Sequence, residues 1–477
     1  MIKHLSVGII YAKRTVKMAE AKMIPPQENK MGTMPIGRLL ATMSTPMMIS
    51  MLVQAFYNVV DSVFVSQISE DALNAVSLAF PLQQLIIAVC GGTAVGMNAL
   101  LSRSLGAKQF DRANKIANSG IFLFLCSAIV FSLIGIFLSK PFFQAQTDVE
   151  QIVNYGIDYV SVCLGCSIGI CSQFCFEKLL QSTGRTMLSM VAQLVGAVIN
   201  IILDPILIFG LFGLPRLEVL GAAIATVSGQ IVAAILAITF NVKFNKDIHI
   251  SFKLIRWDSH IIKDIYKIGL PSIIMQSIGS VMTFTMNKIL ISFTTTATAV
   301  FGSYFKLQSF VFMPIFGLNN GMVPIIAYNY GAKRYDRVKK TITITIITAI
   351  SIMFVGLLAF ELIPHVLLSF FNASEEMLRI GVPALRIIGT HYIFAGFCII
   401  AGSVCQAIGK PVYSLIVSVC RQLVVLLPSA WLLSLSGRLE LVWFCFPIAE
   451  TVSLILSSIF LSKTMRRAKE KMKDIII

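Results

Sequence analysis

A chain of 477 residues in which 56% are hydrophobic and only 13% are charged, with a mean hydropathy of +0.82, is too apolar for an ordinary soluble protein, because its apolar surface exceeds any core that could bury it. The formal net charge of +16 would suit a nucleic-acid partner, but the basic residues lie in alternate loops rather than on one continuous face. We therefore expect a protein of the lipid bilayer with no nucleic-acid partner.

The predicted elements are apolar segments, each long enough to cross about 30 Å of hydrocarbon as a helix of about 20 residues. In chain order they are residues 40–66, 73–101, 118–139, 153–176, 187–211, 219–241, 264–292, 298–326, 344–364, 377–406, 411–435 and 441–462. The sequence therefore predicts an all-α integral membrane protein with 12 transmembrane helices. Prolines inside several segments predict kinks, which indicate helices that move around a cavity.

The basic residues are distributed unevenly between the two sides of the predicted membrane. Of the 39 Lys and Arg residues, 31 lie in the N-terminal segment, in the loops after every second helix and in the C-terminal tail. Because cytoplasmic loops are enriched in Lys and Arg, we expect a multi-pass protein of the cell inner (plasma) membrane with both termini cytoplasmic. The expected parts are a cytoplasmic N-terminal extension (1–38), an N-terminal lobe of six helices (39–241), a cytoplasmic linker (242–263), a C-terminal lobe of six helices (264–462) and a basic cytoplasmic tail (463–477).

The two predicted lobes are copies of one another. Adding 225 to a position in the first half repeatedly gives the same residue in the second, without a gap over more than a hundred positions. Two copies with the same order of apolar segments are typical of a membrane protein whose halves are related across a central axis. The matching positions include Pro46 and Pro271, Gly92 and Gly317, Gly96 and Gly321, Gly106-Ala107-Lys108 and Gly331-Ala332-Lys333, and Asp111-Arg112 and Asp336-Arg337.

Four oxygen-bearing side chains are predicted to lie at one depth in the N-terminal lobe. A helix rises about 1.5 Å per residue, so depth can be counted along each span. Asp61 lies about two turns below the outer surface, and Asp204 on the fifth helix lies at nearly the same level. Asn200 lies one turn from Asp204 on the same helical face, and Thr226 on the sixth helix reaches the same depth. A charged side chain at the bilayer centre costs about 2.5–3.5 kcal/mol on insertion scales, so each is a candidate for function.

This set of side chains has two chemical uses. Carboxylate, amide and hydroxyl oxygens suit a hard cation such as Na⁺, which Asp61, Asn200 and Asp204 could hold. Two carboxylates in lipid also suit proton binding, because desolvation and like charge both favour the protonated form of one member. The structural alternative is that Asp204-Pro205 ends or kinks a helix while Asp61 pairs with a neighbouring helix.

The second copy has not kept these residues, since the positions 225 later are Met286, Val425 and Ser429. Its spans contain other charges instead, which we expect to be buried: Lys306, Arg386, Arg421 and Glu450. Arg421 and Glu450 each lie about ten residues into their spans, so an ion pair between two helices is the favoured interpretation over contact with a substrate.

Candidates for contact with a substrate come from both lobes. Methionine and aromatic side chains of the second lobe would suit a large lipophilic cation if they face a cavity. Such residues also commonly face lipid or neighbouring helices. The candidates are Gln54, Tyr57, Asn58, Met282, Met286 and Lys306. All ten cysteines lie inside predicted helices, where small apolar packing is a simpler interpretation than a metal site.

Several motifs together resemble the multidrug and toxic compound extrusion (MATE) transporters of a bacterial branch, over residues 35 to about 463. None of these motifs would be sufficient alone. They are Gln54-Ala55-Phe56-Tyr57-Asn58-Val59-Val60-Asp61, Ser102-Arg103-Ser104-Leu105-Gly106-Ala107-Lys108, Asn200-Ile201-Ile202-Leu203-Asp204-Pro205, Asn329-Tyr330-Gly331-Ala332-Lys333, and Trp443 through Pro447 to Glu450.

The resemblance implies two six-helix lobes that enclose a central cleft, and export of lipophilic organic cations and drugs by antiport with H⁺ or Na⁺. It implies that Asp61, Asn200 and Asp204 serve the coupling ion, with Thr226 as their partner on the sixth helix. The expected protein is a transporter and not an enzyme, works as a monomer in the bilayer and needs no cofactor. The alternative is a lipid-linked oligosaccharide flippase of the same superfamily, whose cavity would need cations for a pyrophosphate.

Overall fold

The computed structural model describes residues 29–251, 254–371 and 373–473. Within these ranges the chain folds into helices joined by short turns and forms no strand, as expected. Most of the expected N-terminal extension, residues 1–28, and the last four residues of the expected tail lie outside the described residues.

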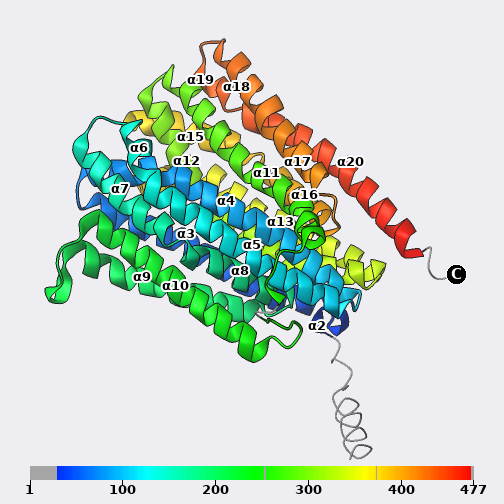
Figure 1. Ribbon diagram of the computed structural model, residues 1–477. Coiled ribbons are helices and arrows are strands. Elements are labelled where there is room, and N and C mark those ends of the chain that lie inside the picture. The colour runs from blue at the N-terminus through cyan, green and yellow to red at the C-terminus, as the bar shows by residue number, and fades with distance from the viewer. Residues whose placement is uncertain (1–28, 252–253, 372, 474–477) are drawn as a thin grey trace, which may run out of the picture.

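The helices of the first half alternate in direction between two ends of the bundle (Figure 1). They are α2 (Lys30–Thr33), α3 (Ile36–Ser66), α4 (Glu70–Gly106), α5 (Phe110–Phe137), α6 (Ser139–Gln144), α7 (Glu150–Gly165), α8 (Ile168–Ser182), α9 (Thr186–Phe209), the 3₁₀ turn η1 (Leu211–Gly213) and α10 (Glu218–Phe244).

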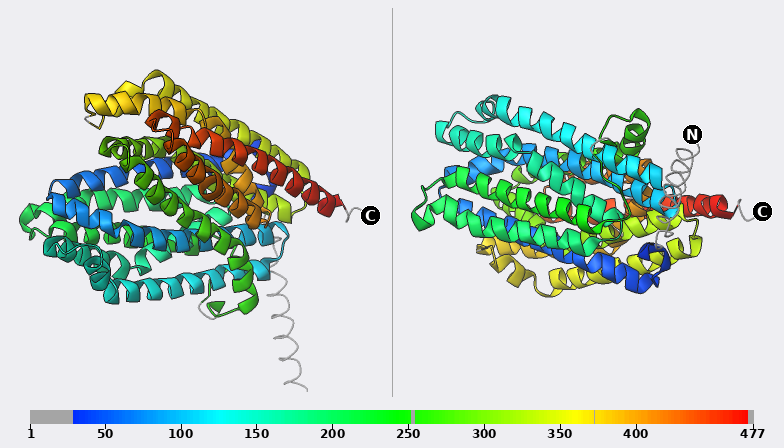
Figure 2. Two further views of the ribbon diagram at one scale, coloured as in Figure 1. Left: turned by 90° about the horizontal axis from the view of Figure 1, so that it is seen from above. Right: turned by 60° about the horizontal axis from the view of Figure 1, so that its bottom comes forward.

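The second half repeats this pattern and ends on a long helix. Its elements are α11 (Ser259–Ile291), α12 (Thr295–Gly331), α13 (Tyr335–Leu362), α14 (Pro364–Ser369), α15 (Glu375–Gly389), α16 (Tyr392–Ala407), α17 (Pro411–Val419), the π-helix η3 (Cys420–Leu426), α18 (Leu427–Ser434), α19 (Leu439–Val442) and α20 (Cys445–Lys473). Figure 2 shows that the C-terminal part of α20 projects beyond the other helices. The expected tail therefore continues the last helix as far as Lys473.

Ten helices in the described part of the chain are long and apolar enough to cross a membrane, and two bent pairs bring the number to 12 if each counts as one span. The pairs are α7 with α8, bent by 42°, and α15 with α16, bent by 48°. The bends fall at residues 166–167 and 390–391, within one residue of the offset of 225. No proline stands at either bend. Helices α3 and α12 continue through Pro46 and Pro314, so the expected kinks at these prolines stay a prediction.

Matching caps begin the equivalent helices α4 and α12. Ser69 accepts a hydrogen bond from the Ala72 amide, and Thr294, the residue 225 positions later, accepts one from the Thr296 amide. A side-chain oxygen in this position satisfies one of the free N–H groups of the first turn. The repeated sequence thus specifies the same helix start twice.

The two Gly-Ala-Lys turns bring the lobes together at the end of the bundle that we call the basic end, made of the turns at residues 107–109, 183–185, 332–334 and 408–410. In the two Gly-Ala-Lys turns the left-handed residues are Lys108 and Lys333, each with φ of 58°, and not Gly106 or Gly331. Gly106 and Gly331 are instead required by close approach, because a Cβ on Gly106 would overlap the Tyr328 carbonyl and one on Gly331 would overlap the Arg103 carbonyl.

Glycines continue this contact along the helices, α4 against α11 and α12 against α3. A Cβ on Gly92 would lie 2.8 Å from the Gly269 carbonyl oxygen, and one on Gly317 would lie 2.6 Å from the Met47 carbonyl oxygen. The same packing recurs one turn later at Gly96 and Gly321. We call these contacts, together with the two Gly-Ala-Lys turns, the lobe seam. It occupies the half of the bundle nearest the basic end.

Candidate functional site

Helices α3, α9 and α10 position the polar residues that the sequence places at one depth, since α9 packs against both of the others. Small residues allow α9 and α10 to approach closely. A Cβ on Gly196 would lie 2.8 Å from the Gly229 carbonyl oxygen, and one on Gly229 would lie 3.1 Å from the Asn200 Cβ. Close backbone approach through glycine is a common means of packing helices in membranes. It brings Asn200 of α9 against Thr226 of α10.

A buried network joins Asn200, Asp204 and Thr226. The hydrogen-bonding pattern sets the orientation of the Asn200 amide, so that its nitrogen donates to Asp204 Oδ2 at 3.2 Å and its oxygen accepts from the Thr226 hydroxyl at 3.3 Å. Asp204 is fully buried, and Asn200 and Thr226 are 3% and 7% exposed. The other carboxylate oxygen, Asp204 Oδ1, is also shielded and has no hydrogen-bond partner among the described residues.

Asp61 of α3 completes this arrangement from the opposite side. Its carboxylate is half-buried, interacts electrostatically with that of Asp204, and has one shielded oxygen, Oδ1, without a hydrogen-bond partner in the described part of the chain. Tyr57, one turn earlier on α3, interacts with both carboxylates and with the Thr226 side chain. The structure therefore brings the four expected ion-coupling residues together and adds Tyr57, which we expected as a substrate contact.

Two residues of α7 border this site and were missed in the sequence. Tyr159 and Cys163 interact electrostatically with Asp61, and the Tyr159 hydroxyl accepts a hydrogen bond from Gln83 of α4 at 3.0 Å. Their one-turn spacing in one expected span was the available signal. Side chains of α3, α7, α9 and α10 thus border the carboxylates, and Gln83 of α4 donates a hydrogen bond to one of these side chains, Tyr159.

This donor set has a limited range of chemistry. Two carboxylate oxygens that lack partners, with hydroxyl groups beside them, can take up a proton or contribute oxygen ligands to a hard cation such as Na⁺. No group of three or more His, Cys, Asp or Glu residues in the described ranges could hold a metal ion. Soft sulfur and nitrogen donors are thus not gathered for a transition metal, and oxygen chemistry remains.

The other expected substrate contacts do not gather at one place. The Gln54 amide donates to Asn58 Oδ1 on the same helix at 3.4 Å. Met286 is fully buried and Met282 nearly so, which means that these side chains fill the lobe interior. Lys306 is exposed and lies 5.9 Å from the centre of the Phe371 ring, a contact within its own lobe.

The charges of the C-terminal lobe separate into different environments. Arg421 of the π-helix η3 lies 3.3 Å from the Glu450 carboxylate of α20, as an ion pair between two helices, and Glu450 is 3% exposed. The expectation that Lys306 and Arg386 would be buried is wrong, because both are exposed. Arg386 donates to the Glu361 carbonyl near the end of α13. These cations therefore do not converge on one pocket that could hold a pyrophosphate.

A second buried polar cluster was missed because Glu177 and Lys178 follow directly after the expected fourth segment. Glu177 is 4% exposed and accepts hydrogen bonds from Gln173 at 2.9 Å and from Gln193 at 2.6 Å. The Lys178 ammonium donates to Gln181 of its own helix and, across the lobes, to Asn320 Oδ1 of α12 at 2.9 Å. The adjacent acid and base between glutamines at helical spacing were the missed signal.

The chain forms two helical lobes from one duplicated unit, and one lobe contains two carboxylates with oxygens that lack hydrogen-bond partners among the described residues. This architecture is that of a multi-pass membrane transporter. The profile of the MatE family matches residues 46–206 and 271–432, which is most of both copies. The chain belongs to this family, and it is a MATE family transporter. The sequence correctly indicated both the family and the fold class.

Relatives and solved structures cover most of the chain. It is 27% identical to "Multidrug export protein MepA" of Staphylococcus haemolyticus (strain JCSC1435), over 87% of this chain and 90% of the relative. It is 26% identical to the protein of the same name from Staphylococcus aureus (strain MSSA476), over 88% and 92%. A solved structure described as "Outward-facing conformation of a multidrug resistance MATE family transporter of the MOP superfamily" matches with a TM-score of 0.87 and 25% identity, covering 93% of this chain and 99% of that one.

Proposed function

We propose that this protein exports lipophilic drugs and organic cations by antiport with H⁺ or Na⁺, with alternating access between its two lobes. The observation that carries the proposal is the pair Asp61 and Asp204, whose shielded oxygens lack partners in the described chain while Asn200 and Thr226 hold the rest of the network. The names of the related multidrug export proteins support this substrate class.

The proposed orientation in the plasma membrane follows from charge. The basic end, with Lys108, Arg185, Lys333 and Lys410, is the cytoplasmic side, because Lys and Arg are enriched there. The lobe seam then closes the cytoplasmic half, so that access is from the outside. The likeness to a structure described as outward-facing supports this assignment.

Ion binding and lobe movement share one helix in this proposal. Two like charges between α3 and α9 repel one another in a low-dielectric interior, and binding of a proton or Na⁺ removes that repulsion. The same α3 helix forms the seam at its other end, where Ser44 donates to the Leu318 carbonyl of α12 at 3.2 Å. A shift of α3 on ion binding therefore changes the contact that holds the cytoplasmic half closed.

Transport in proteoliposomes tests the proposal. With an imposed pH or Na⁺ gradient, we expect the wild type to move ethidium, a flat lipophilic cation, against its own gradient. Asp61→Asn and Asp204→Asn should abolish gradient-driven transport while leaving the chain folded, because neither amide can bind the ion in the same way. Asp148→Asn, in the exposed turn between α6 and α7, is the matched control. Unchanged transport in both site variants would disprove the assigned site.

A further inference from the structure

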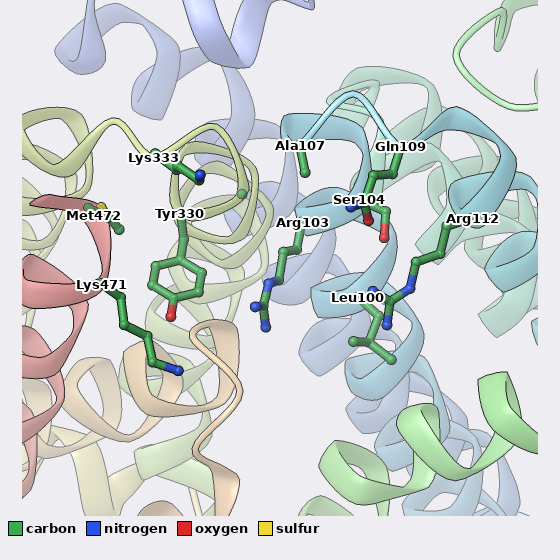
Figure 3. A pocket seen from close by; sticks show the side chains of 11 residues that line it. Leu100, Arg103, Ser104, Ala107, Gln109, Arg112, Tyr330, Lys333, Lys471 and Met472 are labelled. Atoms are coloured by element: carbon green, nitrogen blue, oxygen red, sulfur yellow. The ribbon is translucent and has the colours of Figure 1, made fainter. Parts of the chain in front are cut away.

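A basic pocket of about 300 Å³ opens at the basic end, between the two lobes. Its cations come from three places: Arg103 and Arg112 from the N-terminal lobe, Lys333 from the turn after α12, and Lys471 from the end of α20. Figure 3 shows Arg103 between Tyr330 and Arg112, with Lys471 approaching from the side of α20. The described residues that line the pocket include no carboxylate.

Two of these cations are held in position by neighbours. The Arg103 guanidinium lies 5.0 Å from the centre of the Tyr330 ring, a contact between the lobes. Arg112 lies 2.8 Å from the Asp264 carboxylate of α11, and both side chains remain nearly half exposed. A guanidinium with one carboxylate partner has donors left over, since it carries five N–H groups in a fixed fork.

The internal repeat places a surface equivalent to part of the pocket lining in the C-terminal lobe, where its side chains bind carbonyl oxygens. The positions 225 after Ser104, Gln109 and Arg112 of the pocket are Asn329, Arg334 and Arg337. In the C-terminal lobe these three side chains donate to backbone carbonyl oxygens of the segment around α2. Asn329 and Arg337 donate to Met31, Arg334 to Gly32, and Arg337 also to Met34.

One copy of this surface therefore binds a cluster of oxygen acceptors supplied by the chain itself, and the equivalent surface in the other copy lines a pocket with additional cations. We propose that this pocket binds a phosphate-bearing anion, either the headgroup of an anionic phospholipid from the facing leaflet or a free phosphate. Arginine forks and lysine point charges suit phosphate oxygens, and basic pockets between helices on the cytoplasmic side of membrane proteins take such headgroups.

The pocket exists only while the seam is closed, because Arg103 and Arg112 belong to one lobe and Tyr330 and Lys333 to the other. A bound phosphate group makes contacts with both lobes that are lost when they separate. It therefore stabilises the closed basic end, since a ligand shifts an equilibrium by its differential affinity for the two states. The expected effect on transport rests on the orientation given under the proposed function, whereas the binding site itself does not.

The test follows the distance between the lobes in nanodiscs. Labels on non-natural residues at Lys115 of α5 and Lys340 of α13, which the repeat offset relates, report separation of the basic end. We expect phosphatidylglycerol to raise the ratio of closed to open molecules by about fivefold or more over phosphatidylcholine, the lower bound of typical couplings. Inorganic phosphate added to phosphatidylcholine discs separates the two sources: a shift with phosphate identifies a free anion, and a shift with phosphatidylglycerol alone identifies a headgroup.

Charge-matched variants decide whether the pocket is responsible. Arg103→Gln with Lys333→Gln should remove the shift, and Lys471→Gln at the projecting end of α20 should weaken it without touching the seam. Lys243→Gln with Lys246→Gln removes two cations from the same end outside the pocket and should leave the shift intact.

The proposal is overturned if neither phosphatidylglycerol nor phosphate changes the ratio of closed to open molecules in the wild type. It is also overturned if the pocket variants show the full wild-type shift, or if the control pair loses as much of the shift as the pocket pair. Thermal unfolding of each variant shows that it is folded, and Lys471→Gln provides the decision should the double variant fail to fold. The readout requires neither a substrate nor an ion gradient. Asp61→Asn should keep the lipid response although it loses transport. A wild type that shows the lipid shift but no gradient-driven transport would count against the proposed function alone.

Discussion

The lobe seam predicts that a single methyl group will shift the balance between the two lobe arrangements. In Gly96→Ala the new Cβ would overlap the Ile265 carbonyl of α11, and its next neighbour, the Gly269 nitrogen, would lie at 3.1 Å. In Gly321→Ala, the equivalent position of the other copy, the new Cβ would lie 2.6 Å from the Ser44 Cα of α3. The new Cβ at residue 321 would also overlap the Ser44 hydroxyl, a side-chain group that can rotate. The Ile265 carbonyl and the Ser44 Cα are backbone atoms, which cannot rotate away.

The size of the effect follows from this geometry. Overpacking of a well-packed contact by one methyl group typically costs about 1–3 kcal/mol. The lobes can relieve the overlap by separating at the basic end, so the cost falls on the closed arrangement alone. A difference of about 1–3 kcal/mol is about a 5- to 150-fold change in the equilibrium. We therefore expect both variants to populate the open basic end, by similar amounts.

The assay is the distance distribution between labels at Lys115 and Lys340 in nanodiscs of neutral lipid. Gly37→Ala is the matched control, because nothing lies within 4 Å of its added Cβ, and it should leave the distribution unchanged. The reasoning fails if Gly96→Ala and Gly321→Ala both fold and keep the wild-type distribution. It also fails if the control shifts the lobes as far as the seam variants do.

The other buried contacts lead to three further predictions. Arg421→Met should lower thermal stability, because breaking a buried ion pair costs about 3–5 kcal/mol at full burial. Adding Glu450→Gln in the same chain should recover part of the loss. A double variant less stable than the single one would contradict this. Glu177→Ala leaves two glutamine amides without an acceptor, at about 1–3 kcal/mol for each buried group, and an unchanged melting temperature would show that the cluster is hydrated. Lys178→Met removes the bond to Asn320 across the lobes and should increase label separation at the basic end, whereas an unaltered distance would assign Lys178 to its own lobe alone.

The sequence was informative wherever a property depends on position along a helix. The offset of 225 located both copies, and with them the glycines of the lobe seam before any contact was known. The depth of Asp61, Asn200, Asp204 and Thr226 could be counted from the helix ends at a fixed rise per residue. The depth of a residue along its helix depends only on its position in the sequence, so the sequence alone is sufficient to predict it.

Tertiary structure decided everything that depends on the direction in which a side chain points around its helix. Lys306 and Arg386 lie within apolar segments, as counted, yet they are exposed, while Met286 is buried inside its lobe. The bends at residues 166–167 and 390–391 contain no proline, so the sequence offered no helix-breaking proline at either place. Rotation about a helix axis is set by several neighbours at once, so the basic pocket became visible only when both lobes were in place.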